Sequence, residues 1–225
     1  MFQRRFVLDS YQNLALLQNL YRLKAAGFKY IDPFNVNQNT TTQKPKSMEE
    51  FSSNLMSCHL CDLSKSRSQA MPGYGDTHAD LMIIDFSVSP NDDELNQYYS
   101  GRSGKILQNM IENVLELKLS QVYFTHAIKC KPLNANTPSI SEWESCKSYL
   151  FWQIEYVKPK VIVTLGKEVY AKMVSEDEDF ENVRGHIIDF ENYKLVPLQH
   201  PSFILRNPQS KKTTFKDLKT IKSCL

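Results

Sequence analysis

Short apolar runs alternate with stretches of helical periodicity along most of this chain, and this alternation limits the folds that it can adopt. Four runs have the length and composition of buried strands, namely residues 81–86 (LMIIDF), 122–128 (VYFTHAI), 160–165 (KVIVTL) and 194–199 (KLVPLQ). Helices are expected over residues 105–117, 141–157 and 167–174. The pattern predicts an α/β fold of three αβα layers around a central, mostly parallel sheet.

Local signals set the expected boundaries and the place of a site. Ser141 and Glu144 have the spacing of a capping box, which predicts the start of the helix over residues 141–157. Parallel α/β sheets bind ligands outside the carboxyl ends of their strands. Four segments are therefore expected to converge there, at residues 85–94, 126–131, 166–167 and 200–206. The isolated glycines match neither a phosphate-binding loop nor a dinucleotide fingerprint, which argues against nucleotide-driven chemistry.

The first 47 residues differ from the rest of the chain. Residues 8–26 have the apolar spacing of an amphipathic helix, which Gly27 ends, and residues 33–46 (PFNVNQNTTTQKPK) are polar and bounded by prolines, as in a linker. We expect an extra N-terminal helix and linker over residues 1–47 and the main domain over residues 48–225.

Composition narrows the setting in which the chain works. It has 225 residues, of which 41% are hydrophobic, with no apolar run near the roughly 20 residues of a membrane span. Its first residues also lack the apolar core of a secretory signal, so a cytoplasmic protein without a membrane partner is expected. A net charge of +2 does not by itself indicate nucleic-acid binding.

Four cysteines have the arrangement of a tetrathiolate site: a close pair, Cys58 and Cys61, followed by single residues at Cys130 and Cys146. Reducing compartments disfavour disulfides and favour metal binding by several cysteines. Structural zinc usually takes two close pairs, so this spacing favours an iron-sulfur cluster over zinc, while buried unligated thiols remain an alternative. The fifth cysteine, Cys224, has no expected role.

Several motifs in the same order resemble those of the iron-sulfur uracil-DNA glycosylases, family 4 of the uracil-DNA glycosylase superfamily. Residues 61–67 (CDLSKSR) are similar to the family's C-x-L-x-x-x-R segment, and residues 128–132 (IKCKP), with Pro138, Glu142 and Cys146, are similar to its VKCRPP...P...E...C segment. Residues 200–206 (HPSFILR) resemble its HPS..LR element. The likeness runs from Cys58 almost to the end of the chain.

This resemblance implies an enzyme that hydrolyses the N-glycosidic bond of uracil, or of a related damaged base, in DNA. It implies a four-iron, four-sulfur cluster with Cys58, Cys61, Cys130 and Cys146 as ligands, and a monomer that acts on single-stranded or duplex DNA. The cluster is expected to organise the DNA-facing surface and not to take part in redox catalysis.

The resemblance also assigns residues to the site, with two departures from the family. His200 is expected to stabilise the leaving base, and Tyr99 to stack on the flipped base. The functional glutamate of the family falls at Phe86, and the asparagine that reads the uracil edge falls at His126. Asp85 is expected to supply the missing carboxylate.

Each assignment also has a structural alternative. Asp92, Asp93 or Glu94 could replace Asp85 as the carboxylate, although they also fit a solvated acidic loop or helix start. Tyr99, His126 and His200 could be ordinary packing or hydrogen-bonding residues. Ser202 and Arg206 complete the expected substrate-binding set, next to a basic stretch comprising Arg206, Lys211, Lys212, Lys216, Lys219 and Lys222. That stretch suits phosphate contacts or a solvated helix face.

Two rival functions follow from these alternatives. Because Phe86 and His126 replace two polar groups of the family's pocket, the chain could be a catalytically weak or inactive relative that binds DNA or a repair partner. A zinc-stabilised interaction protein is the other rival. Neither base specificity nor the preference for one or two DNA strands can be predicted from the residues alone.

Overall fold

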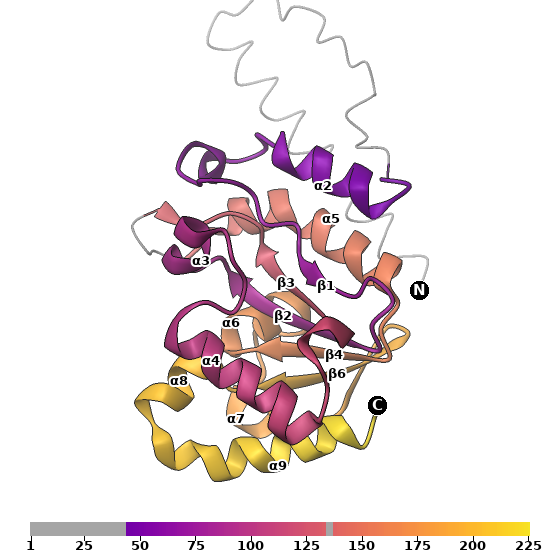
Figure 1. Cartoon of the computed structure of the whole chain (residues 1–225), viewed down its shortest axis with the longest axis vertical. Coiled ribbons are helices and arrows are strands. Elements are labelled where there is room, and N and C mark those ends of the chain that lie inside the picture. The colour runs from indigo at the N-terminus through magenta and orange to yellow at the C-terminus, as the bar shows by residue number, and fades with distance from the viewer. Residues whose placement is uncertain (1–43, 134–136) are drawn as a thin grey trace, which may run out of the picture. The chain divides into compact units, whose positions relative to one another are not determined.

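A six-stranded sheet lies at the centre of the computed structural model, which describes residues 44–133 and 137–225 (Figure 1). Its strands are β1 (Tyr74–Gly75), β2 (Leu81–Ser87), β3 (Val122–Ile128), β4 (Val161–Leu165), β5 (Ile188–Phe190) and β6 (Tyr193–Leu198). They are arranged in the order β1-β3-β2-β4-β6-β5. The four central strands are parallel, and the two short edge strands, β1 and β5, are antiparallel to their neighbours.

Helices cover both faces of the sheet. The α-helices are α2 (Met48–Met56), α3 (Pro90–Leu95), α4 (Gly101–Met110), α5 (Ile140–Val157), α6 (Lys167–Met173), α7 (Phe180–Val183), α8 (Pro201–Arg206) and α9 (Lys211–Lys222). A π-helical turn, η2 (Ile111–Leu115), extends α4, and single 3₁₀ turns occur at η1 (Asp62–Lys65), η3 (Leu119–Gln121) and η5 (Pro208–Ser210).

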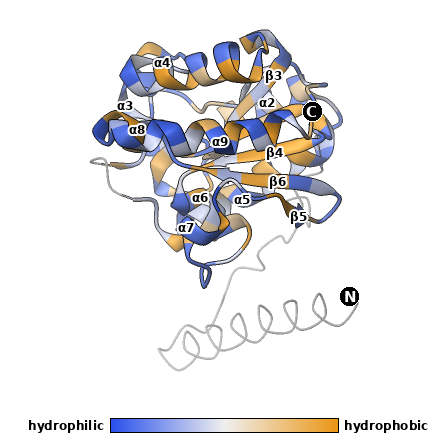
Figure 2. Cartoon of the chain, turned by 90° about the horizontal axis from the view of Figure 1, so that it is seen from below, coloured by the Kyte–Doolittle hydropathy of each residue, from blue (hydrophilic) through white to orange (hydrophobic). Residues whose placement is uncertain are grey.

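Two hydrophobic clusters, one on each face of the sheet, form the core. Met82 and Ile84 of β2 point to the face that α2, α5, α6 and α7 cover, whereas Leu81 and Ile83 point to the face that α4, η2, α8 and α9 cover. Figure 2 shows β4 and much of β6 in the hydrophobic colour and α9 mostly in the hydrophilic colour, with a few hydrophobic positions. The predicted three-layer αβα fold with a mostly parallel sheet is confirmed.

All four predicted strands are present, and the misses lie where local sequence signals are weak. The edge strands β1 and β5 have two and three residues, too few to give a period-two pattern. Helix α4 begins at Gly101, four residues before the predicted start. The helical periodicity does not reveal this first turn (GRSG), because it contains no apolar residue. Pro197 lies within β6 but beyond the residues of that strand that pair with β5, so its missing N–H breaks no bond to that strand.

The capping box of α5 was predicted at the wrong pair of residues. Ser139, not Ser141, is the N-cap: its side chain accepts a hydrogen bond from the backbone N–H of Glu142, whose carboxylate accepts one from the backbone N–H of Ser139. Both serines are followed three positions later by a glutamate, so the spacing alone could not distinguish them. Glu144 instead pairs with Lys147 on the helix surface.

The described residues from Pro45 onward belong to one compact unit, which runs to Leu225. The predicted helix over residues 8–26 lies outside the described residues. Among the helices that are described, none is long and apolar enough to cross a membrane.

Candidate active site

A cavity of about 610 Å³ opens at the carboxyl ends of the parallel strands. All four segments that were expected to converge contribute residues to its lining, together with residues 99–104 at the start of α4. From the predicted site, the cavity is lined by Asp85, Phe86, Tyr99, His200, Ser202 and Arg206. It has the position at which open α/β sheets bind ligands.

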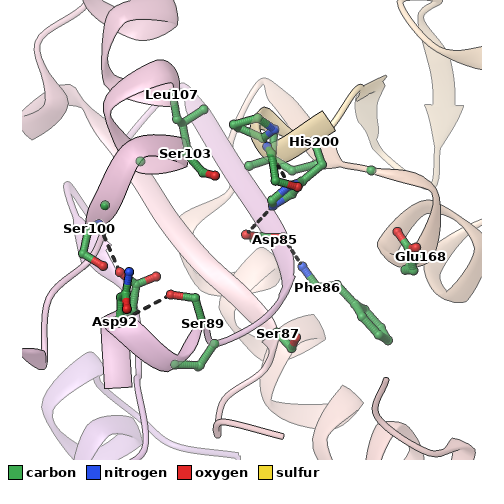
Figure 3. Close-up of a pocket in the computed structure, with 18 of the residues that line it drawn as sticks. Asp85, Phe86, Ser87, Ser89, Asp92, Ser100, Ser103, Leu107, Glu168 and His200 are labelled. Atoms are coloured by element: carbon green, nitrogen blue, oxygen red, sulfur yellow. Dashed lines mark hydrogen bonds and ion pairs between the residues drawn. The ribbon is translucent and has the colours of Figure 1, made fainter. Parts of the chain in front are cut away.

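A histidine–aspartate pair lies at this cavity, as Figure 3 shows. Asp85 comes from the end of β2, and His200 follows β6 as the N-cap of α8. The Nε2 atom of His200 lies 3.1 Å from Oδ2 of Asp85, and Oδ1 of Asp85 accepts a hydrogen bond of 2.7 Å from the backbone N–H of Phe86. The pair therefore brings together two predicted residues that are 115 positions apart.

Both members of this pair have shifted pKa values. Burial alone would raise the pKa of Asp85, but the charge and hydrogen bond of His200 outweigh burial and hold that pKa below its usual range. Burial alone would lower the pKa of His200, but the charge and hydrogen bond of Asp85, aided by the charge of Glu168, raise it overall. The two shifts extend the pH range over which a carboxylate faces an imidazolium.

His126 lies beside Asp85 in the sheet but does not line the cavity. The two residues are in register across β2 and β3, and the His126 side chain is almost fully buried. Its ring packs against Tyr98 at 5.8 Å and Phe124 at 5.0 Å, and its Nδ1 has no hydrogen-bond partner among the described residues. Burial lowers the pKa of His126 to about 4, so the ring is neutral near pH 7.

The two predicted aromatic residues lie on opposite faces of the sheet. Tyr99 lies at the cavity, where its ring packs 4.6 Å from Phe124 and its buried Oη lacks a partner within the described part of the chain. Phe86 belongs to the hydrophobic cluster of the other face, and Figure 3 shows its ring directed away from Asp85 and His200. Phe86 nevertheless counts among the residues that line the cavity.

The adjacent acidic residues of α3 have different surroundings. Asp92 lines the cavity, and its Oδ1 accepts a hydrogen bond of 3.0 Å from the backbone N–H of Ser100. Asp93 does not line the cavity. Its carboxylate accepts hydrogen bonds from the backbone N–H and the hydroxyl of Ser68, and it forms an ion pair of 3.0 Å with Lys131. Glu94 is exposed and outside the cavity lining. Asp92 therefore organises the start of α4, and Asp93 attaches the preceding loop to the rim.

Positive charge around the cavity comes from three helices and the loop after β3. Arg102, Lys131, Lys167 and Arg206 all line it. Of the predicted basic stretch, only Arg206 reaches the cavity; in α9, Lys219 lies over the ring of Phe215 and Lys222 pairs with Glu116. No local pattern marks Arg102 and Glu168 as lining residues, because each is an ordinary charged residue in the first turn of a helix.

The four candidate metal ligands lie on the face of the sheet that α5 covers. Cys130 and Cys146 are buried in the hydrophobic cluster there, and Cys58 and Cys61 pack against it. Arg67 donates to the Sγ of Cys130 at 2.9 Å and to the carbonyl of Cys58, while the backbone N–H of Lys129 points to the Sγ of Cys146 at 3.4 Å. Across residues 44–133 and 137–225, no three His, Cys, Asp or Glu side chains are grouped closely enough to hold a metal ion.

The four cysteines nonetheless have the chemistry of ligands to an iron-sulfur group. It offers four soft sulfur atoms from three segments, with an arginine and a backbone N–H directed at two of them, as is typical around thiolate ligands. Burial raises the pKa of Cys146 to about 11, so a metal would have to displace a proton from this thiol.

The fold and the site together define a class of protein. At the carboxyl edge of its three-layer αβα sheet, the chain combines a histidine–aspartate pair with cationic residues, groups that can transfer protons and contact phosphates. The family model described as "Uracil DNA glycosylase superfamily" matches residues 72–219. The chain belongs to this superfamily.

Comparison with curated proteins specifies the branch. The chain is 33% identical to a type-4 uracil-DNA glycosylase of Sulfurisphaera tokodaii, over 78% of this chain and 84% of that protein. It is also 33% identical to the type-4 enzyme of Saccharolobus solfataricus, over 75% and 82% of the two chains, and 30% identical to that of Archaeoglobus fulgidus, over 78% and 92%. The resemblance to the type-4 family is confirmed.

Proposed function

We propose that the chain excises uracil, or a closely related damaged base, from DNA by hydrolysing the bond between the base and its deoxyribose. The observation that carries this proposal is the pair of His200 and Asp85 at the cavity, in a chain whose type-4 relatives are uracil-DNA glycosylases. Such enzymes act on a nucleotide that has left the base stack and entered a pocket. The cavity has a volume in the range of small-molecule sites.

The proposed chemistry follows from where charge develops. When the glycosidic bond breaks, the electron pair goes to the base, and the sugar becomes positive. His200 donates its Nε2 proton to the base oxygen as that oxygen becomes negative, which a fixed donor in a shielded site stabilises by about 3–4 kcal/mol. Asp85 supplies the negative charge that faces the sugar and orients the attacking water. Tyr99 supplies the ring on which the base stacks.

Phosphate binding completes the proposal. Arg102, Lys167 and Arg206 border the cavity mouth, and Lys211, Lys212 and Lys216 are exposed at the start of α9. Contacts of this kind position DNA without reading its sequence, and each one weakens binding as salt rises. We infer that single-stranded or duplex DNA with a damaged base is the partner.

We also propose that Cys58, Cys61, Cys130 and Cys146 hold a four-iron, four-sulfur cluster. When bound, the cluster supplies a structural crosslink between the loop before η1, the end of β3 and α5. Arg67 would balance its negative charge. This crosslink would hold Lys131, next to Cys130, at the cavity rim.

Excision assays on uracil oligonucleotides test the enzymatic proposal. The full-length protein, purified without oxygen, should release uracil from single-stranded or duplex DNA, scored by strand scission at the abasic site. His200→Ala should lower the rate about 10²–10³-fold with little change in DNA affinity, whereas His78→Ala, an exposed histidine of a turn, should not. Equal rates in the wild type and His200→Ala would remove the assigned role.

One observation favours a second candidate function. The Nε2 atom that should bind the base is held by Asp85 in the structure, as expected for a relative that binds DNA without turnover. DNA binding by the wild type without any release of uracil would support this candidate.

Iron analysis tests the cluster independently. Cys130→Ala should lose iron and brown colour, and Cys224→Ala, which changes the fifth cysteine, should retain both. An unchanged iron content in Cys130→Ala would refute the ligand assignment.

A further inference from the structure

The hydrogen bonds around His200 define which ring nitrogen carries its proton. The backbone N–H of Ser202 donates to Nδ1 at 3.1 Å, which requires a lone pair on Nδ1. The hydroxyl of Ser202 lies 2.6 Å from the same nitrogen. In the neutral ring the proton therefore resides on Nε2, and Nε2 donates it to Oδ2 of Asp85.

The carboxylate that receives this proton is itself fixed. Oδ1 of Asp85 accepts from the N–H of Phe86, in the same strand, and the Asp85 side chain is only 20% exposed. The strand pairs with β3 through Asp85 and with β4 up to Ile84, so its backbone cannot shift easily. A continuous row of hydrogen bonds thus connects Ser202, His200, Asp85 and Phe86. Asp85 accepts from both of its neighbours in this row.

This row places an oxygen where the base oxygen should bind. The proposed function assigns the Nε2 proton of His200 to the leaving base, yet Oδ2 of Asp85 holds that proton in the structure. One N–H cannot make two full hydrogen bonds at once. A neutral carbonyl oxygen is a weaker acceptor than a carboxylate, but the base oxygen gains negative charge as the glycosidic bond breaks.

We propose that Asp85 acts on His200 before it acts on the substrate: it accepts the hydrogen bond that keeps the ring proton on Nε2, and it releases this hydrogen bond to the base oxygen as charge develops there. The exchange frees Oδ2 of Asp85, while Oδ1 stays bound to Phe86. The released carboxylate oxygen then faces the positive sugar and the water. This inference rests on the proposed glycosylase function and adds to it a resting hydrogen bond between His200 and Asp85 that the substrate must open.

Other charged groups near His200 come from each element around it. Glu168 of α6 raises the pKa of His200, Arg206 of α8 lowers it, and His126 of β3 lowers the pKa of Asp85. Asp85 makes the only hydrogen bond to Nε2 among the described residues, so its effect on His200 is the direct one.

Nitrogen NMR of the histidine rings tests the pair without any need for activity. The chain has five histidines, and the His200 signals are identified by their absence from His200→Gln. In the wild type, Nε2 should give the signal of a protonated nitrogen in the neutral ring, and the midpoint of protonation should lie above that of an ordinary histidine. Asp85→Asn should lower this midpoint, and Asp85→Glu should restore part of it.

A matched control and a kinetic readout complete the experiment. Asp80 directly precedes β2, and its exposed carboxylate pairs with Lys160. Asp80→Asn should leave the midpoint of His200 protonation unchanged. In excision assays, Asp85→Asn should lower kcat on the order of a hundredfold, change KM less, and move the His200 limb of the pH–rate profile to lower pH.

The possible results are distinct. An unchanged midpoint and tautomer in Asp85→Asn would overturn the proposed pair. A shifted midpoint with an unmoved pH–rate profile would overturn its use in catalysis. Absence of uracil release by the wild type would instead defeat the proposed function, which the NMR result does not depend on.

Discussion

Asp93 offers a test that separates a structural carboxylate from a catalytic one. Its side chain is almost fully buried and receives hydrogen bonds from the N–H and hydroxyl of Ser68, at 3.0 and 2.9 Å, and an ion pair from Lys131. We predict that Asp93→Ala destabilises the fold strongly and leaves the chemistry of each folded molecule unchanged.

The magnitude follows from these contacts. Two hydrogen bonds to a charged acceptor contribute roughly 1.5–3 kcal/mol each. Lys131 is about one-third exposed, so its ion pair adds about 1 kcal/mol or less. Removing one partner of a buried charged network costs about 3–5 kcal/mol. We therefore expect a loss of about 3–5 kcal/mol in the free energy of unfolding.

Urea unfolding followed by circular dichroism measures this loss. With a slope of about 2–3 kcal/mol per molar urea, the midpoint should fall by roughly 1–2 M. Glu94→Ala, at the exposed neighbouring position, should change the free energy by less than about 0.5 kcal/mol. A kcat that falls by orders of magnitude in stably folded Asp93→Ala would refute the reasoning and make Asp93 the catalytic carboxylate.

Three further predictions concern stability. The pKa of Asp85 is lowered from its ordinary value of 3.8, so its pairing with His200 stabilises the fold above about pH 3.8. The pKa of His200 is raised from its ordinary value of 6.5, so the same pairing stabilises the fold fully below about pH 6.5. The difference in Tm between the wild type and Asp85→Asn should therefore be widest near pH 4–6.5 and should narrow as pH rises through the raised pKa of His200. His126 has a pKa of about 4 when folded, so the wild type should lose on the order of 3 kcal/mol between pH 6.5 and 4; chemical unfolding of His126→Asn across this range should show a smaller loss, and an equal loss would contradict a buried neutral ring. A Cβ on Gly104 would lie 2.0 Å from the backbone oxygen of Tyr99, so Gly104→Ala should cost about 1–3 kcal/mol by denaturant titration and slow excision; unaltered stability would show that α4 shifts freely.

The central strands were predictable because they are buried on both faces. Residues 81–84 form a continuous apolar run, and residues 161–165 are apolar except for Thr164, as expected for parallel strands under helices on each side. The edge strands carried no such signal, since pairing with a neighbour, not a local pattern, defines two or three residues as a strand. The capping box of α5 was ambiguous for a related reason: both serines satisfy the local rule, and the structure uses Ser139.

The site was predictable in its membership more than in its arrangement. Asp85 lies near the end of one strand and His200 follows another, and the carboxyl ends of these strands meet at one edge of the sheet. Their joint presence could therefore be anticipated, but their hydrogen bond depends on the rotamers of both side chains. Asp92 and Asp93 are equivalent in the sequence, yet a rotation of about 100° per helical residue sends one to the cavity and the other to Ser68. Of the four cationic residues that line the cavity, only Arg102 lies outside the segments that were expected to converge there, because the start of α4 was not recognised as part of the site.

The order of the strands has a consequence for how the protein matures. The central strand β6 is the last of the sheet to be made, and it completes one side of β4 and receives β5. His200 follows it directly, and α8 and α9 then pack on α4 and η2, elements formed about a hundred residues earlier. During synthesis, Asp85 and the first part of the pocket emerge long before their partner. A chain that ends before residue 200 lacks His200 and therefore has no working pocket, so we expect base excision only after β6 and α8 have been made.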